Sequence, residues 1–258
     1  MSRKILKNKP LVEAILELKW VLPTETVIGF QGDPYYPLLL KRFAEKAQAD
    51  YPFHEFLPAA QAPDAMVVHM VQHRFRIAKD QWPLLQIGVG VMTVNDTSGY
   101  TWPEFSKRCH KAVSDLVLSH PEREQFRVQE LTLRYIDAAR LDDNGDVFAF
   151  LRDKMRTTVG LPPELFKDKS IPPTPKVFSW QSSFAIDHPR GLVTLRFGLG
   201  QREGHPSLIW ETLVQATGDD IPVLPDGFEE WAKAAHDITD DCFFILIKGE
   251  LERRFDGD

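Results

Sequence analysis

The sequence predicts an α+β protein: a mainly antiparallel sheet of about seven strands, helices packed on one side of it, and a long C-terminal helix. Three observations support this prediction. Several short segments alternate apolar and polar residues, most clearly residues 192–199, as strands with one buried face do. Longer segments repeat apolar residues every three or four positions, which is typical of amphipathic helices. Helical and strand segments do not alternate regularly, as they would in a parallel α/β fold.

The first half of the chain predicts strand, helix, two strands, helix, strand and helix, in that order. Its first segment fits both a strand and a helix by apolar spacing. We choose the strand because Pro10 and Pro23 leave only a strand-length stretch between them. The expected strands are residues 11–20, 66–78, 84–94 and 126–137, and the expected helices are residues 36–49, a segment opening at 101, and residues 146–156.

Local signals mark helix starts and one irregular strand. Thr101 with Glu104, and the later pair Asp226 with Glu229, have the spacing of a capping box. Asp146 is the expected N-cap of the short helix that follows it. In the strand at 126–137 the apolar positions change parity near residues 129–130, which predicts a β-bulge.

Residues 161–175 contain five prolines and no apolar period, so they are the best candidate for an internal boundary. Three strands are expected after it, at 177–186, 192–199 and 208–216, followed by the long helix that opens near residue 226. We therefore expect a first half at residues 1–160, a connector at 161–175 and a second half at 176–258, or one compact domain made of both halves. No internal repeat is evident.

The composition is that of an ordinary folded protein, with 258 residues, a formal net charge of −6, 26% charged residues and 43% hydrophobic residues. The acidic balance argues against indiscriminate coating of DNA or RNA, which requires Lys and Arg at phosphates. The N-terminus lacks the apolar core of a signal peptide, and no apolar run could span a membrane. Cys109 and Cys242 fall on apolar helix faces. We expect a soluble cytoplasmic protein with reduced cysteines, no cofactor and no metal.

Sequence signatures of catalysis are absent: there is no P-loop, no Gly-x-Ser-x-Gly elbow and no Cys-x-x-Cys. His69 and His73 are four positions apart, but on a strand this separates them by about 13 Å, too far to share one zinc ion. The sequence therefore assigns no reaction.

Arginines on strands are the leading candidate site. Arg74 and Arg76 share one strand face, and Arg134 and Arg196 each alternate with apolar neighbours. If the strands are neighbours, four guanidinium groups line one sheet face, where they can bind carboxylates or phosphates bidentately. This predicts a non-enzymatic binding module for a protein partner, a nucleotide or a nucleic acid. The alternative is an ordinary solvated face with the arginines paired to Glu130 and Glu211.

A second candidate cluster lies on the last helix. His236 and Asp240 are one turn apart, and Asp241 follows directly. Groups of this kind could serve a metal-dependent hydrolase or nuclease if they converged in a pocket. The alternative is a solvated helix face. The sequence leaves open whether the protein forms a homo-oligomer.

Several short segments, spread over nearly the whole chain, are similar to those of one protein family. Residues 10–15 have the sequence Pro-Leu-Val-Glu-Ala-Ile, and related segments follow at 133–137 and 243–250. Together they resemble a sporadically distributed family of uncharacterised bacterial proteins with an N-terminal Pro-Leu-x-Glu-Ala-Ile pattern. The resemblance implies no particular activity. From the patchy distribution of the family we expect a mobile gene and an accessory role in a defence or toxin system. Residues that match the family pattern are Asn95, Tyr100, Trp102, Arg134, Tyr135 and Asp137.

Overall fold

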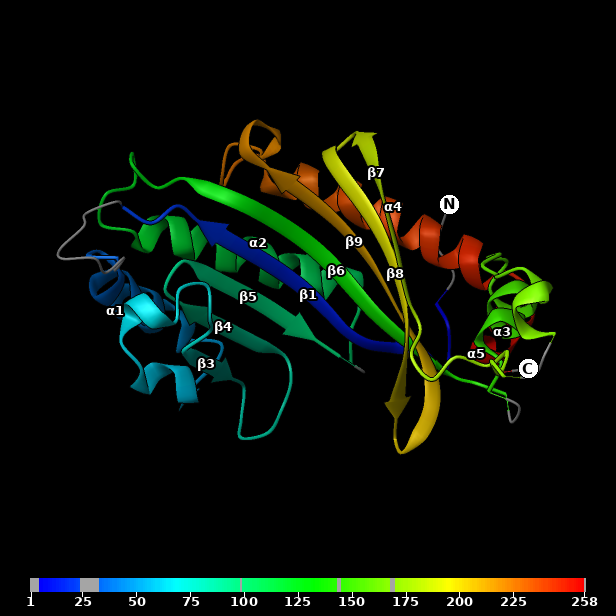
Figure 1. The fold of residues 1–258 in the computed structure, drawn as a ribbon. Coiled ribbons are helices and arrows are strands. Elements are labelled where there is room, and N and C mark those ends of the chain that lie inside the picture. The colour runs from blue at the N-terminus through cyan, green and yellow to red at the C-terminus, as the bar shows by residue number, and fades with distance from the viewer. Residues whose placement is uncertain (1–4, 24–32, 98, 143–144, 168–169, 258) are drawn as a thin grey trace.

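A computed structural model shows one nine-stranded antiparallel sheet with helices on one of its faces (Figure 1). It describes residues 5–23, 33–97, 99–142, 145–167 and 170–257. The α+β class is confirmed, with nine strands where about seven were expected. The strands are β1 (Leu11–Trp20), β2 (Phe53–Phe56), β3 (His73–Arg76), β4 (Leu84–Gly88), β5 (Val91–Asp96), β6 (Val128–Arg140), β7 (Ser179–Asp187), β8 (Arg190–Arg202) and β9 (His205–Thr217). The α-helices are α1 (Tyr36–Ala47), α2 (Trp102–Ser119), α3 (Val147–Lys154), α4 (Phe228–Ile247) and α5 (Glu250–Asp256).

The sheet has the strand order β2-β3-β4-β5-β1-β6-β9-β8-β7. Its two halves, β1–β5 with α2 and β6–β9 with α4, have similar topologies, with five strands in the first and four in the second. Each half begins with a strand and a helix, continues through antiparallel strands and closes with a long helix, α2 or α4. In each half the first strand pairs with the last: β1 with β5, and β6 with β9. The two first strands, β1 and β6, pair with each other and join the halves. The repeat lies in strand order and not in residue identity, so it leaves no trace in the sequence.

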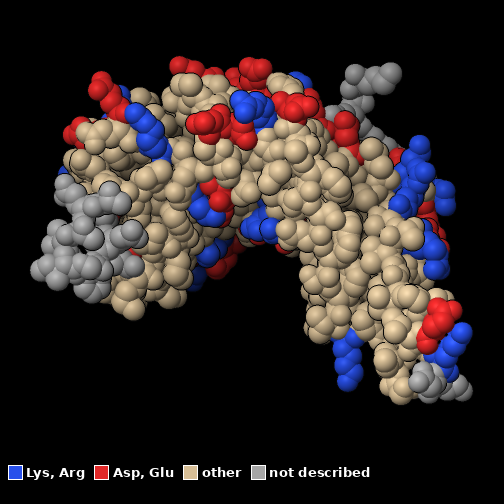
Figure 2. Space-filling view, turned by 45° about the horizontal axis from the view of Figure 1, so that its top comes forward, with Lys and Arg blue, Asp and Glu red and all other residues tan. Residues whose placement is uncertain are grey.

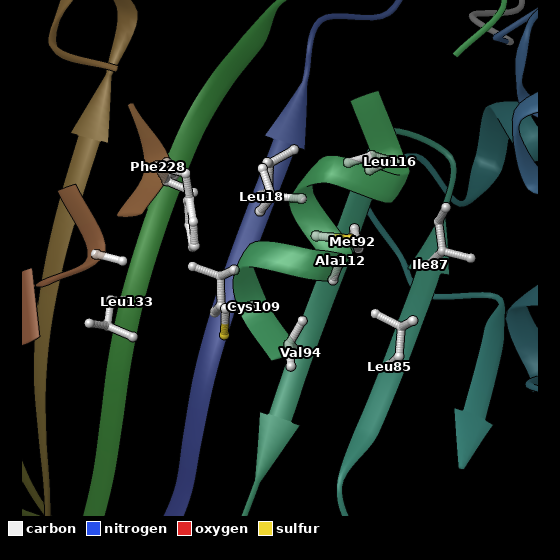
Figure 3. Packing of buried hydrophobic residues seen from close by; sticks show 14 of the residues in the cluster. Leu18, Leu85, Ile87, Met92, Val94, Cys109, Ala112, Leu116, Leu133 and Phe228 are labelled. Atoms are coloured by element: carbon white, nitrogen blue, oxygen red, sulfur yellow. The ribbon is translucent and has the colours of Figure 1, made fainter. Parts of the chain in front are cut away.

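The main apolar core lies between the sheet and the helices α1, α2 and α4. Figure 3 shows Cys109, Ala112 and Leu116 of α2 directed at strand residues such as Leu18 and Val94. A second cluster joins α3 and α5 to β8 and β9 around Trp210 and Phe197. The opposite sheet face has no helix over it in the part of the chain that the structure describes (Figure 1).

Several local predictions are confirmed. Asp146 caps α3, where its Oδ1 accepts from the backbone N–H groups of Phe148 and Ala149, both at 3.0 Å. The bulge is present, because Lys19 pairs with Glu130 but Trp20 pairs with Val128, which leaves residue 129 without an opposite partner. Both cysteines are free thiols on the inner sides of their helices.

Other local predictions are wrong. Residues 84–94 are not one strand but a hairpin, which turns at Gly90 with φ +77°. Within residues 66–78, which were expected to form one strand, only His73–Arg76 (β3) are a strand. Strand β2 lies in a segment that was expected to be a loop. Neither capping box forms: Thr101 makes no capping hydrogen bond, and α4 begins after Gly227. The C-terminal helical region is divided, because Gly249, with φ +123°, separates α4 from α5.

No helix in the described ranges has the length and apolarity needed to cross a lipid bilayer.

Candidate ligand-binding site

The four strand arginines lie on the uncovered sheet face, but in two separate groups. Arg74 and Arg76 are on β3, whereas Arg134 and Arg196 are on β6 and β8. Four strand steps separate β3 from β6 in the sheet, or roughly 19 Å at the usual strand spacing. Figure 2 shows the molecule arching over a hollow whose walls carry both basic and acidic side chains. The structure therefore brings Arg134 and Arg196 together and places Arg74 and Arg76 elsewhere.

Each arginine group has its own carboxylate. Glu55 lies 2.8 Å from Arg76 and 3.8 Å from Arg74. Glu211 lies 3.3 Å from Arg196 and 3.7 Å from Arg134. Glu130 and Glu211 were the acidic partners expected for the arginines on a solvated face. Glu211 does pair with arginines, whereas Glu130 pairs with Lys19 at 2.9 Å.

A groove of about 380 Å³ runs along this face past Arg134 and Arg196. Its lining is polar, and Lys19, Arg134 and Arg196 are balanced by Glu17, Glu130 and Glu211. Glu211 lies beside both guanidinium groups, so an anionic ligand in this groove would meet a competing carboxylate.

A second hollow, on the helix side of the sheet, is mainly apolar. It measures about 370 Å³ and lies between the segment before β1, the start of α2, strand β6 and helix α4. Ile5, Leu6, Leu11, Phe243 and Phe244 form much of its wall. The polar side chains in its lining are Lys9, Tyr100, Thr101, Tyr135, Asp137, Thr212, His236, Thr239 and Asp240.

Regular strand and helix periods place these groups. On β6 the inward positions Leu131 and Leu133 are followed by Tyr135 and Asp137, so the same parity turns from apolar core to polar cavity. On α4, His236, Asp240 and Phe243 recur at spacings of four and three, which sets them on one helix face.

A row of hydrogen-bonded rings forms part of the cavity wall. The hydroxyl groups of Tyr100 and Tyr135 are 2.9 Å apart, and the Tyr135 hydroxyl lies 3.0 Å from Nδ1 of His236. The Trp102 ring stacks on the His236 ring, with centroids 3.9 Å apart and an interplanar angle of 13°. Burial raises the pKa of both tyrosines well above the usual value, so both phenols keep their protons at neutral pH.

Asp137 is the buried carboxyl of this cavity. Its side chain is 4% exposed, and burial raises its pKa to about 8, with Arg202 acting in the opposite direction. Thr212, opposite Tyr135 on β9, also lines the cavity, and its buried hydroxyl has no hydrogen-bond partner within the described chain. Lys9 is engaged, because its Nζ donates to the carbonyl oxygen of Tyr100 at 2.7 Å.

The predicted helix cluster is only partly assembled. His236 and Asp240 both line the cavity, whereas Asp241 is exposed and lies outside its lining. Among the described residues, no group of three or more His, Cys, Asp or Glu side chains is arranged to hold a metal ion. Of the three residues predicted for a hydrolase or nuclease site, only His236 and Asp240 lie at the cavity.

Sequence reasoning did not assign Tyr100, Trp102, Tyr135 or Asp137 to a binding or catalytic site. One signal was present: an aspartate continues the buried parity of the strand after Leu131, Leu133 and Tyr135. A carboxyl group at a core position is uncommon enough to mark a candidate site.

Comparison with known proteins gives little further information. No protein-family model matches the chain, and no curated protein sequence matches it. A similar solved structure is the di-domain ARO/CYC StfQ from the steffimycin biosynthetic pathway. The two chains are 9% identical, with a TM-score of 0.22 over 84% of this chain and 95% of that chain. At that TM-score the likeness supports no inference about this protein.

Proposed function

We propose that this protein is a binding protein for a small, largely apolar organic molecule, which occupies the cavity between the segment before β1, α2, β6 and α4. One observation carries the proposal: an apolar hollow holds a hydrogen-bonded row of Tyr100, Tyr135 and His236. Apolar walls provide affinity through burial, and a few convergent polar groups orient the ligand.

The dimensions agree with this role. A volume of about 370 Å³ lies at the lower end of the range for small-molecule sites, roughly 300–1,000 Å³. The aromatic side chains Trp102, Phe243 and Phe244 offer large flat surfaces for contact. The ligand would therefore be a compact molecule with one polar end.

The groove on the opposite sheet face is the weaker candidate. Glu211 lies 3.3 Å from Arg196 and 3.7 Å from Arg134, so a phosphate or carboxylate would compete with its charge at both guanidinium groups. Binding through the arginines stays a prediction, and we place the ligand in the apolar cavity instead.

The direct test is binding of an uncharged hydrophobic dye, N-phenyl-1-naphthylamine, followed by its fluorescence. We expect saturable binding to the wild-type protein. Asp240→Trp places a bulky ring at the cavity wall and should weaken dye affinity by about tenfold or more, a change of about 1.4 kcal/mol.

The matched control is Asp237→Trp. Asp237 lies on the same helix, pairs with Lys233 at 2.7 Å and does not line the cavity. The Asp237→Trp substitution should leave dye affinity within about twofold of wild type, a difference well under 1 kcal/mol. Absence of saturable dye binding to the wild-type protein, or equal loss in both variants, would contradict the proposal.

A further inference from the structure

The carboxyl group of Asp137 accepts no hydrogen bond from any residue that the structure describes. Within the described part of the chain its side chain makes no hydrogen bond and no ion pair, although it is 4% exposed and lines the cavity. A buried carboxyl that is not hydrogen-bonded costs free energy, and native proteins rarely leave one in that state. Its position in a cavity wall indicates that its partner arrives with a ligand.

Two nearby cations are committed to other groups. The Nη1 of Arg202 donates to the carbonyl oxygens of Pro10 at 2.8 Å and Ala138 at 3.1 Å. Lys9 donates to the carbonyl oxygen of Tyr100. Arg202 therefore acts on Asp137 only through its electrostatic field.

Five aromatic rings form another part of the cavity lining. The rings of Tyr100, Trp102, Tyr135, Phe243 and Phe244 border the same space, and Asp240 adds a second carboxyl to its wall. Ring faces carry negative electrostatic potential and attract organic cations. Aromatic rings around a desolvated carboxyl form the lining that recognises an ammonium group, and they disfavour an anion.

The buried hydroxyl of Thr212 restricts the chemical class of the ligand further. The Thr212 hydroxyl is buried without a partner, and the β6–β9 register sets Thr212 opposite Tyr135, two residues from Asp137. An amine with at least two N–H bonds could donate to both the Asp137 carboxylate and the Thr212 oxygen.

We infer that the ligand of this cavity is an apolar molecule bearing a protonated primary or secondary amine, and that this ammonium group pairs with Asp137. The inference rests on the proposed function and adds the chemical class of the ligand. The apolar body of the ligand lies against Phe243 and Phe244, and its nitrogen lies at the polar end formed by β6 and β9.

The test compares three probes that share one ring system and differ in charge. Calorimetric titration with 1-naphthylmethylamine, 1-naphthylmethanol and 1-naphthoate measures each affinity directly. On the wild-type protein we expect the amine to bind about tenfold tighter than the alcohol, and the carboxylate to bind weakest. This ranking requires no variant, so it decides the question even if a substitution disturbs folding.

Asp137→Asn identifies the residue responsible. The variant keeps the shape of the side chain but cannot form a carboxylate, so it should keep its affinity for the alcohol and lose the preference for the amine. Asp237→Asn, on α4 outside the cavity, should keep the preference.

Two failures can be told apart. If neither the uncharged dye nor any of the three probes binds, the proposed function fails, and this inference fails with it. If the dye binds but the alcohol matches the amine, or if Asp137→Asn keeps the full preference, only the assignment of an amine is overturned.

Discussion

The hydroxyl of Tyr135 lies 3.0 Å from Nδ1 of His236, a residue 101 positions further along the chain. This contact joins a central strand of the sheet to the last long helix. The same hydroxyl lies 2.9 Å from that of Tyr100, so one oxygen connects three elements, namely β6, α4 and the turn before α2. All three residues of this junction line the cavity.

Tyr135→Phe tests the junction. The substitution removes a buried hydroxyl and leaves the groups on Tyr100 and His236 without their shared partner, which should lower the free energy of unfolding by about 1–3 kcal/mol. Urea denaturation measures this change. The control is Tyr36→Phe, because the Tyr36 hydroxyl is buried without a hydrogen-bond partner among the described residues, and its loss should be neutral or stabilising. Equal destabilisation by both substitutions would show that the hydroxyl contacts contribute nothing specific.

Helix capping gives a second test, because two similar sequence signals have different outcomes. Asp146→Ala removes a side chain that accepts from two backbone N–H groups of α3 and should cost about 0.5–2 kcal/mol. Thr101→Ala should cost much less, since Thr101 makes no capping hydrogen bond at α2. Thermal or urea unfolding of the two variants checks the difference, and a larger loss for Thr101→Ala would contradict this description of the two caps.

These examples show which features a sequence can predict. The bounds of β1, the cap at Asp146 and the bulge near residue 129 follow from neighbouring residues alone, and each is confirmed. The hairpin of β4 and β5 was missed because every residue in both strands is buried, which erases the alternation of one wet and one dry face. Strand β2 was missed because four residues are too few to show a period.

The cavity could be predicted only in part, for a different reason. Tyr100, Tyr135 and His236 meet through strand order and helix placement, and no spacing along the chain encodes that meeting. The spacing of His236 and Asp240 found one wall of the cavity, because both lie on one helix. The arginine pattern correctly put its residues on one sheet face, but it could not show that Glu55 and Glu211 hold them in two groups.

Glu211 controls the arginine groove in a way that can be tested. Its carboxylate lies near both Arg134 and Arg196, so Glu211→Gln should leave two adjacent cations without their acidic partner. We expect tripolyphosphate to raise the melting temperature of this variant more than that of wild type, because a ligand that binds only the native state stabilises it. Added salt should reduce the effect.

The double variant Glu211→Gln, Arg196→Ala should lose most of that tripolyphosphate response. A wild-type response as large as that of Glu211→Gln would mean that Glu211 does not compete with anions for the two guanidinium groups.

Asp137 should make stability fall as pH rises. Its pKa is about 8 in the folded protein and about 4 in an unfolded chain, so between these values the native state holds a proton that the unfolded state has released. Each pH unit in this window therefore lowers the free energy of unfolding by up to about 1.4 kcal/mol. Below pH 4 and above pH 8 the contribution no longer changes.

Asp137→Asn removes this proton uptake, so the variant should gain stability relative to wild type as the pH rises from 5 to 8. The other charged groups around the cavity, Lys9, Arg202, His236 and Asp240, are present in both proteins, and their titration largely cancels in the comparison. Urea unfolding at three pH values measures the difference, and Asp226→Asn, at an exposed residue, is the control. A stability difference that stays constant with pH would contradict the raised pKa. A difference that grows with pH would mean that Asp137 is held uncharged in the empty cavity. The Asp137 carboxyl must then release its proton to solvent when it pairs with a bound ammonium group.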